Sequence, residues 1–233
     1  MTTRSELPII LAAVVAVLVV GVGAFLLLTR DTSDPELTLT DSAEGSGETV
    51  DTDALDGPWA VVPGPDGEAT QAGYRVDEVF AAGAREATAN GRTYTVTGTL
   101  TVADNAVTEA TFTVDVTTLT SDEDRRDNAI RTRGLETDSY PEATFELTEP
   151  IELPEIVDGA TVDIPATGEL TLRDVTNEVT MDLTVRAVGD RFTVQGAAPV
   201  AFADYGIEAP SIGDFVTVED NGSFEFVVNL EPA

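Results

Sequence analysis

From Pro58 onward, apolar and polar residues alternate along the chain in one short run after another, and this period of two constrains the fold more than any other feature. The clearest run is TYTVTGTLTV at residues 93–102, where threonines occupy every second position. Successive side chains of a strand point to opposite faces, so each run predicts a strand with one apolar and one polar face. β-Branched threonine suits the polar face of a strand. Further runs lie at residues 111–116, 170–172, 179–185 and 224–230.

Turn-forming dipeptides separate several of these runs. Asp104-Asn105, Gly189-Asp190 and Asn221-Gly222 each have the composition of a tight hairpin turn. Repeated hairpins with one apolar face per strand predict an antiparallel sheet with one face in water. Roughly eight such strands can close into an up-and-down barrel or form a sandwich. Alternation alone does not distinguish these two all-β folds.

The sequence also predicts one or two short helices. Residues 122–133 are charged and have a helical pattern, with Ser121 and Asp124 resembling a capping box and Gly134 suited to the C-terminal cap. A weaker second helix is expected at residues 77–84. Both segments are short beside the strand-forming part of the chain.

The amino-acid composition excludes several functions. The chain has no cysteine and no histidine, all of its basic residues are arginine, and its net charge is −31. Disulfides and thiolate metal sites are therefore excluded, and so much negative charge repels nucleic acid. Acids at residues 51–57 resemble the start of an EF-hand loop, but the third acid and the glycine come one place late. We expect no metal and no cofactor.

An enzymatic function is also disfavoured. Without histidine or cysteine, general acid–base catalysis would fall to Asp, Glu or Tyr, and a serine nucleophile would lack its usual base. The sequence contains no nucleophile-elbow, phosphate-loop or dinucleotide-binding motif. The prediction is a protein that is not an enzyme.

Residues 8–28, PIILAAVVAVLVVGVGAFLLL, contain no charged residue. As a helix rising about 1.5 Å per residue they would span roughly 30 Å, the thickness of the hydrocarbon core of a bilayer. A cleavable signal peptide is the alternative, but the run is long for one and ends without a small-x-small cleavage site. We therefore expect an uncleaved, single-pass anchor in the cell membrane.

The anchor divides the chain into four predicted parts. Arg4 on the short N-terminal flank favours a cytoplasmic N-terminus, residues 1–7, and an extracytoplasmic domain. Residues 29–56 are acidic and rich in Thr, Ser and Gly, which is typical of a flexible tether. Residues 57–233 then form the single β domain.

Motifs in this domain resemble a known family. Residues 119–147 read LTSDEDRRDNAIRTRGLETDSYPEATFEL, and the order of the elements SDE, RD, L and YP-x-ATF is similar to the YceI-like family. Further matches are YRVDEVF at residues 74–80, GELTLRDVTNEVTM at 168–181, and the stretch 202–226 with DYGI near its start. The resemblance covers about residues 57–230. It implies a lipocalin-like β-barrel of about eight strands, from a family implicated in binding polyisoprenoid lipids.

In a barrel of this kind the apolar face of each strand points inward, and eight strands leave room for packed side chains or for one small ligand. The ligand prediction rests on the resemblance, because an inward apolar residue taken singly is more often part of a filled core. The candidate ligand-binding residues are Tyr94, Val96, Leu100, Phe112, Val114, Phe145, Leu147, Leu170, Met181, Leu183, Phe202, Phe224 and Phe226.

Two sets of side chains are candidates for contact with a polar head group. Guanidinium groups suit a prenyl phosphate, and four arginines cluster at Arg125, Arg126, Arg131 and Arg133. Alternatively these arginines form helix-surface pairs, because Asp122 and Asp127 each precede an arginine by four residues. An isoprenoid quinone would need only hydrogen bonds, for which Tyr74, Tyr94 and Tyr205 are candidates.

Two functions follow from the sequence. The first is a membrane-tethered extracytoplasmic binding or carrier protein for an apolar amphiphile, a polyisoprenoid such as a prenyl phosphate or a quinone, held in the barrel. The second is a filled barrel that binds a protein partner through its outer surface and takes no small ligand. A carrier needs an apolar lumen, whereas an interaction module needs a packed interior and an apolar patch outside.

Overall fold

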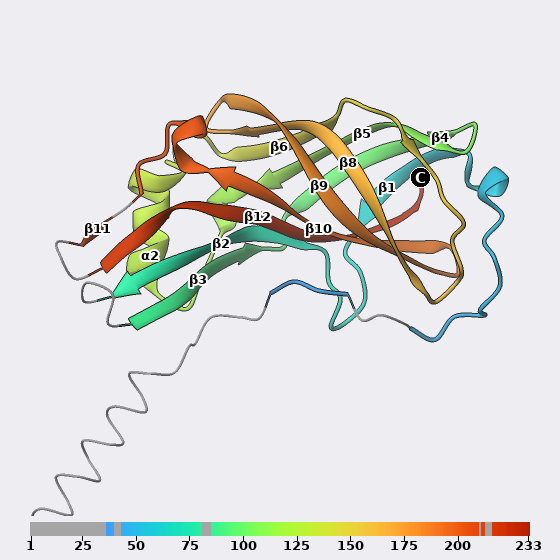
Figure 1. Cartoon of the computed structure of the whole chain (residues 1–233), viewed down its shortest axis with the longest axis horizontal. Helices are drawn as coiled ribbons and strands as arrows, with labels where there is room; N and C mark the ends of the chain where they lie inside the picture. Colours follow the sequence, from blue (N-terminus) through green and yellow to red (C-terminus); the bar gives the residue numbers. More distant parts are fainter. Residues whose placement is uncertain (1–35, 40–42, 81–84, 210, 213–215) are drawn as a thin grey trace, which may run out of the picture. The chain divides into compact units, whose positions relative to one another are not determined.

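The computed structural model describes residues 36–39, 43–80, 85–209, 211–212 and 216–233 (Figure 1). The predicted cytoplasmic N-terminus, the predicted anchor at residues 8–28 and the first part of the predicted tether lie outside this range. Within it, no helix is both long and apolar enough to cross a membrane.

Eight antiparallel strands form a closed ring, so the all-β barrel implied by the resemblance is confirmed. Each strand pairs with the next, and the first pairs with the last. Around the ring they are β1 (Gly57–Val62), β4 (Val96–Ala103), β5 (Ala106–Asp115), β6 (Glu142–Leu147), β8 (Thr161–Leu172), β9 (Val175–Val188), β10 (Arg191–Ala201) and β12 (Val216–Pro232).

Four further strands of the described residues lie outside the ring. β2 (Gln71–Phe80) and β3 (Arg85–Thr93) form a hairpin that pairs with β12, while β7 (Ile151–Glu152) pairs with β5 and β11 (Ser211–Ile212) pairs with β12. The helical turns are η1 (Thr52–Leu55), η3 (Val116–Thr118), α2 (Asp124–Ala129), η4 (Ile130–Gly134) and η5 (Phe202–Tyr205).

Closure depends on the long strand β12. One edge of β12 pairs with β10 from Asn221 to Leu230. The other edge is shared, because β2 pairs with its first part up to Val227 and β1 pairs with its end from Asn229. The β2–β3 hairpin therefore extends the wall at the α2 end, and β1 closes the ring at the end where η1 lies (Figure 1).

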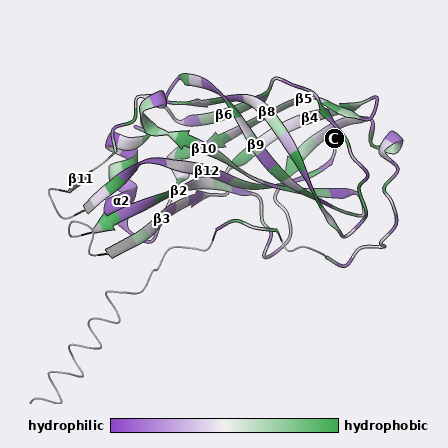
Figure 2. Cartoon of the chain, viewed as in Figure 1, coloured by the Kyte–Doolittle hydropathy of each residue, from purple (hydrophilic) through white to green (hydrophobic). Residues whose placement is uncertain are grey.

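The alternation predicted from the sequence is present along the ring strands, where hydrophilic and hydrophobic residues alternate (Figure 2). Apolar side chains from all eight strands meet inside the ring in two adjoining clusters, one with Leu170 and Phe224 and the other with Trp59 and Leu230. Tyr94 does not follow the alternation, because it lies in the turn before β4. In this turn the Thr95 amide donates a hydrogen bond to the Thr93 hydroxyl at 3.0 Å. The Tyr94 side chain is 68% exposed, so its predicted inward orientation is wrong.

Two of the three predicted hairpin turns are confirmed. Asp104 and Asn105 both adopt positive φ, 53° and 62°, between β4 and β5, and Gly189 has φ 59° between β9 and β10. Asn221 and Gly222 instead lie within β12, where the register to β2 shifts between Val218 and Gly222, so the dipeptide marks a bulge. A hairpin turn at Arg173-Asp174, also with positive φ, was missed.

The predicted helix at residues 122–133 is confirmed in shortened form. Within this segment, α2 is α-helical and η4 continues it as a π-helical turn. The predicted capping box is wrong, because Glu123 occupies the N-cap and the Ser121 hydroxyl bonds Asp127 at 2.6 Å. Of the weaker second helix, residues 77–80 are strand and residues 81–84 lie outside the described range.

Buried charged side chains lie on the outer face of the barrel. Glu225 is 1% exposed and forms ion pairs with Arg92 and Arg75 on the outward face of the sheet. Arg186, 2% exposed, pairs with Glu68 from the loop before β2. Neighbouring residues of a strand point to opposite faces, and Phe224, Phe226 and Val185 line the interior, so Glu225 and Arg186 face away from it.

Residues 43–56, which we call the strap, lie against the barrel at the η1 end, although the sequence predicts them to be part of the tether. The Val50 amide bonds the Ile156 carbonyl at 2.8 Å, and the Asp158 amide bonds the Glu48 carbonyl at 2.9 Å. The Ala43 amide bonds the Gly159 carbonyl at 2.8 Å. Val50 and Leu55 pack against the second apolar cluster.

The carboxylate of Asp158 joins the strap to two parts of the barrel. It accepts hydrogen bonds from the backbone amides of Ser46 and Gly189, the latter at 2.8 Å, and these amides hold its pKa below the usual range. The backbones cross closely here, since a Cβ on Gly45 would lie 2.5 Å from the Gly159 Cα. Only glycine permits this approach.

We predict that Asp158 holds the strap at neutral pH. A carboxyl whose pKa is lowered by folding stabilises the fold above its unfolded value, about 3.9, and loses that contribution as the pH falls through the folded value. Replacing Asp158 with alanine should therefore speed amide hydrogen exchange in residues 43–50 at pH 7. The difference from the unsubstituted protein should disappear once acid protonates Asp158.

The matched control for this prediction is Asp182→Ala, at an exposed position on β9 away from the strap. Exchange in the strap should not change in this variant. Equal exchange in the Asp158→Ala variant and the unsubstituted protein at pH 7 would contradict the assigned role of Asp158.

Candidate ligand-binding lumen

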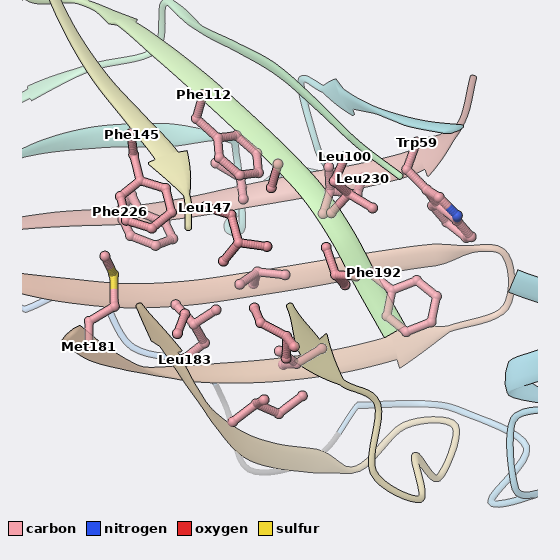
Figure 3. A pocket seen from close by; sticks show the side chains of 18 of the residues that line it. Trp59, Leu100, Phe112, Phe145, Leu147, Met181, Leu183, Phe192, Phe226 and Leu230 are labelled. Atoms are coloured by element: carbon pink, nitrogen blue, oxygen red, sulfur yellow. The ribbon is translucent and has the colours of Figure 1, made fainter. Parts of the chain in front are cut away.

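The ring encloses an elongated apolar cavity of about 150 Å³, which we call the lumen. Every residue that lines it is apolar except Thr144. Figure 3 shows its side chains extending from Phe145, Phe226 and Met181 at one end to Trp59 and Phe192 at the other. Because the lining offers almost no hydrogen-bonding group, only an apolar molecule or an apolar part of one could occupy the lumen without a desolvation cost.

Glycines on neighbouring strands make room for the phenylalanine rings. Phe226 lies opposite Gly196, and a Cβ on that glycine would come within 2.7 Å of the ring and 2.8 Å of Leu183. Phe112 lies opposite Gly98, where a Cβ would approach the ring to 2.4 Å. Each ring therefore occupies the space left by a missing side chain on the next strand, which keeps the centre of the lumen open.

Most of the predicted ligand-binding residues meet in this one cavity. Two do not: Tyr94 is exposed, and Phe202 lies in η5, where it lines a second cavity. Whether the others contact a ligand stays a prediction. The predicted residues that line the lumen are Val96, Leu100, Phe112, Val114, Phe145, Leu147, Leu170, Met181, Leu183, Phe224 and Phe226.

The sequence did not single out the lining at the strap end. Leu55 and Trp59 lie there, with Ile156 from the segment before β8 and Phe192 from β10. Trp59 and Phe192 pack edge to face with ring centroids 5.2 Å apart, and the Trp59 indole donates to the Leu55 carbonyl at 2.9 Å. The available signal was the single tryptophan, which stands in the run GPWAVV after the acidic segment.

A second cavity of about 80 Å³ lies beneath α2 and η4. Phe224 lines both cavities, so they share a wall. The second cavity is mostly apolar, but Tyr74, Glu78 and Arg126 also line it. Arg126 pairs with Glu78 at 3.3 Å and with Asp122, four residues before it, as predicted for a helix-surface pair.

The four clustered arginines do not converge on either cavity. Arg125, Arg131 and Arg133 are exposed, and only Arg126 lines the second cavity, where two carboxylates already engage it. The predicted Asp127–Arg131 pair is not among the ion pairs of the described residues, and Asp127 accepts hydrogen bonds from Ser121.

Of the candidate tyrosines, Tyr74 lines the second cavity, and Tyr94 and Tyr205 line neither of the two cavities. The Tyr74 hydroxyl is buried, and burial raises its pKa, so Tyr74 remains a neutral hydrogen-bond donor. Tyr205 is buried in η5 and packs in the first apolar cluster, where burial also raises its pKa. Among the described residues, no group of three or more acidic side chains is placed to hold a metal ion.

A closed antiparallel barrel with an apolar lumen is the arrangement of the lipocalin-like proteins. A model of the YceI-like domain matches residues 65–230, and the chain belongs to this family. No curated protein matches the chain. The strap and β1 precede the matched residues.

Several solved structures are similar to this chain, and the first of them shares its fold. A polyisoprenoid binding domain from Saccharophagus degradans, implicated in plant cell wall breakdown, is 19% identical with a TM-score of 0.57, over 75% of this chain and 98% of that one. BcnA of Burkholderia cenocepacia is 17% identical with a TM-score of 0.49, over 67% and 95%. The YCEI protein of Campylobacter jejuni is 14% identical with a TM-score of 0.47, over 59% and 81%.

We predict that Gly196→Ala narrows the lumen. The atoms nearest to the added methyl group are the ends of the Phe226 and Leu183 side chains, which it would push inward. Affinity for an apolar dye such as N-phenyl-1-naphthylamine, measured by its fluorescence, should fall. Overpacking of this kind costs about 1–3 kcal/mol of stability, so the variant should remain folded by circular dichroism.

Thr99→Val serves as the control, because Thr99 is exposed on the outer face of β4. It should leave dye affinity unchanged. Unchanged dye affinity in Gly196→Ala would show that the dye does not enter the lumen.

Proposed function

We propose that this protein binds or carries an apolar amphiphile in its lumen, and that the ligand is a polyisoprenoid such as a prenyl phosphate or an isoprenoid quinone. The observation that carries the proposal is the lumen itself, an elongated cavity with a nearly unbroken apolar lining. Membership of the YceI-like family and the fold shared with a polyisoprenoid binding domain support the choice of ligand class. The role is binding rather than catalysis.

Burial of the ligand tail would supply the affinity. At about 25 cal/mol per Å², a tail that buries about 400 Å² gains on the order of 10 kcal/mol before association costs. This gain permits micromolar or tighter binding without any charged contact. The polar head group then contributes mainly to selectivity.

The lumen must widen to accept a long tail. A cavity of about 150 Å³ holds roughly one benzene-sized group. A polyisoprenoid therefore requires lining side chains to move apart. Met181 is flexible and can adopt several shapes, and the rings of Phe112 and Phe226 line the same space.

The proposal includes a place in the cell. Residues 8–28 would anchor the chain in the cell membrane with the barrel on the extracytoplasmic side, and residues before the strap would form the tether. The motivating observation is the uncharged apolar run in the sequence. A barrel tethered in this way would stay close to the bilayer that supplies a lipid.

The test is mass spectrometry of organic extracts from the full chain, purified natively alongside two variants. Val114→Trp adds bulk to the lumen, and Thr111→Trp adds the same bulk at an exposed position of the same strand. We expect one isoprenoid to be present at about one per chain and to be lost only in Val114→Trp. The Thr111→Trp preparation controls for lipids carried over from the membrane.

Equal lipid content in all three preparations would overturn the proposal. It would favour the alternative of a filled barrel that binds a protein partner.

A further inference from the structure

The two ends of the lumen differ in what closes them. At the strap end, Leu55 reaches the lumen beside Trp59, and the Leu55 carbonyl accepts the indole hydrogen bond of Trp59. Ile156, only 1% exposed, lines the same end, and its carbonyl accepts a hydrogen bond from the Val50 amide. At this end the strap therefore supplies the apolar side chain of Leu55 and a backbone hydrogen bond from Val50.

Several independent bonds fix the strap in place. Thr49 and Val157 form an isolated β-bridge, and Asp158 binds the strap through both its backbone amide and its carboxylate. The close approach of Gly45 to Gly159 leaves no room for a side chain between them. Such an arrangement resists displacement by a ligand from within the lumen.

The α2 end has the opposite character. The second cavity lies on the other side of Phe224, beneath α2 and η4, and its polar lining includes Tyr74, Glu78 and Arg126. The strap end of the lumen offers no polar side chain, because Leu55, Trp59 and Phe192 present their apolar surfaces. An amphiphile therefore matches the cavities in only one orientation, with its head group toward α2.

We propose that the strap closes one end of the lumen, which we call the blind end, so that an amphiphile enters and leaves at the α2 end. The tip of its tail then lies against Leu55 and Trp59. The strap thereby limits the length of tail that the lumen accepts. This inference rests on the proposed function and adds the direction of binding and a length-determining segment. The strap precedes residues 65–230, which the model of the YceI-like domain matches.

Trp59 is the only tryptophan in the chain, which gives a direct test in the full-length, unsubstituted protein. The probes are two dodecanols of equal length, one with bromine on the terminal carbon and one with bromine on the second carbon. Bromine quenches indole fluorescence on contact. We expect the terminal bromine to quench Trp59 several-fold more strongly at equal occupancy, where occupancy is measured by displacement of N-phenyl-1-naphthylamine.

The outcomes distinguish the proposed orientation of the ligand from the proposed function, which is binding in the lumen. Stronger quenching by bromine near the hydroxyl, or equal quenching by both probes, would overturn the orientation while leaving ligand binding intact. Failure of both probes to displace the dye, together with failure to detect either bound by native mass spectrometry, would overturn the proposed function instead.

A second experiment tests the length limit with geraniol, farnesol and geranylgeraniol, a series of increasing chain length. Leu55→Ala removes bulk at the blind end, so the longest prenol bound should be longer than in the unsubstituted protein. Ile130→Ala makes a similar truncation in the second cavity and should leave the length limit unchanged. An unchanged limit in Leu55→Ala, or an equal shift in both variants, would contradict the proposal.

Discussion

Pairing of β1 with the last residues of β12 is the constraint on which the rest of the structure depends. Without the ladder from Trp59–Pro232 to Val62–Asn229, the strands would form an open sheet with β1 unpaired at one edge. Closure turns one apolar face of that sheet into the wall of a lumen. It also brings Trp59 on β1 beside Phe192 on β10, so the same pairing forms one end of the cavity.

The closed ring separates two kinds of burial. Inside it, apolar side chains meet with almost no polar group among them. Outside it, charged groups such as Glu225 and Arg92 are buried in ion pairs that leave the interior uncharged. A buried charge is tolerated only when it is paired. Placing these groups on the outer face preserves a lumen that can accept an apolar molecule.

Alternation predicted β4, β5, β9 and parts of β8 and β12, with eleven of the residues that line the lumen, because a period of two assigns each residue to a face. It did not single out β1 or β10. It failed at Tyr94, where a threonine hydroxyl turns the chain before the strand begins, and at Asn221-Gly222, where a bulge has the composition of a turn. The attachment of the strap could not be predicted from composition. The strap is held through hydrogen bonds of its backbone and by the carboxylate of Asp158. Any sequence can make backbone hydrogen bonds, so the acidic composition of the strap does not distinguish it from a flexible linker.

The central claim is that the lumen holds the tail of an amphiphile, and a crystal structure of the natively purified protein tests it most directly. Our account predicts continuous tubular electron density from the neighbourhood of Phe145 and Phe226 to Trp59, with the lining side chains spread around it. A lumen filled by its own side chains, without such density, would contradict the account.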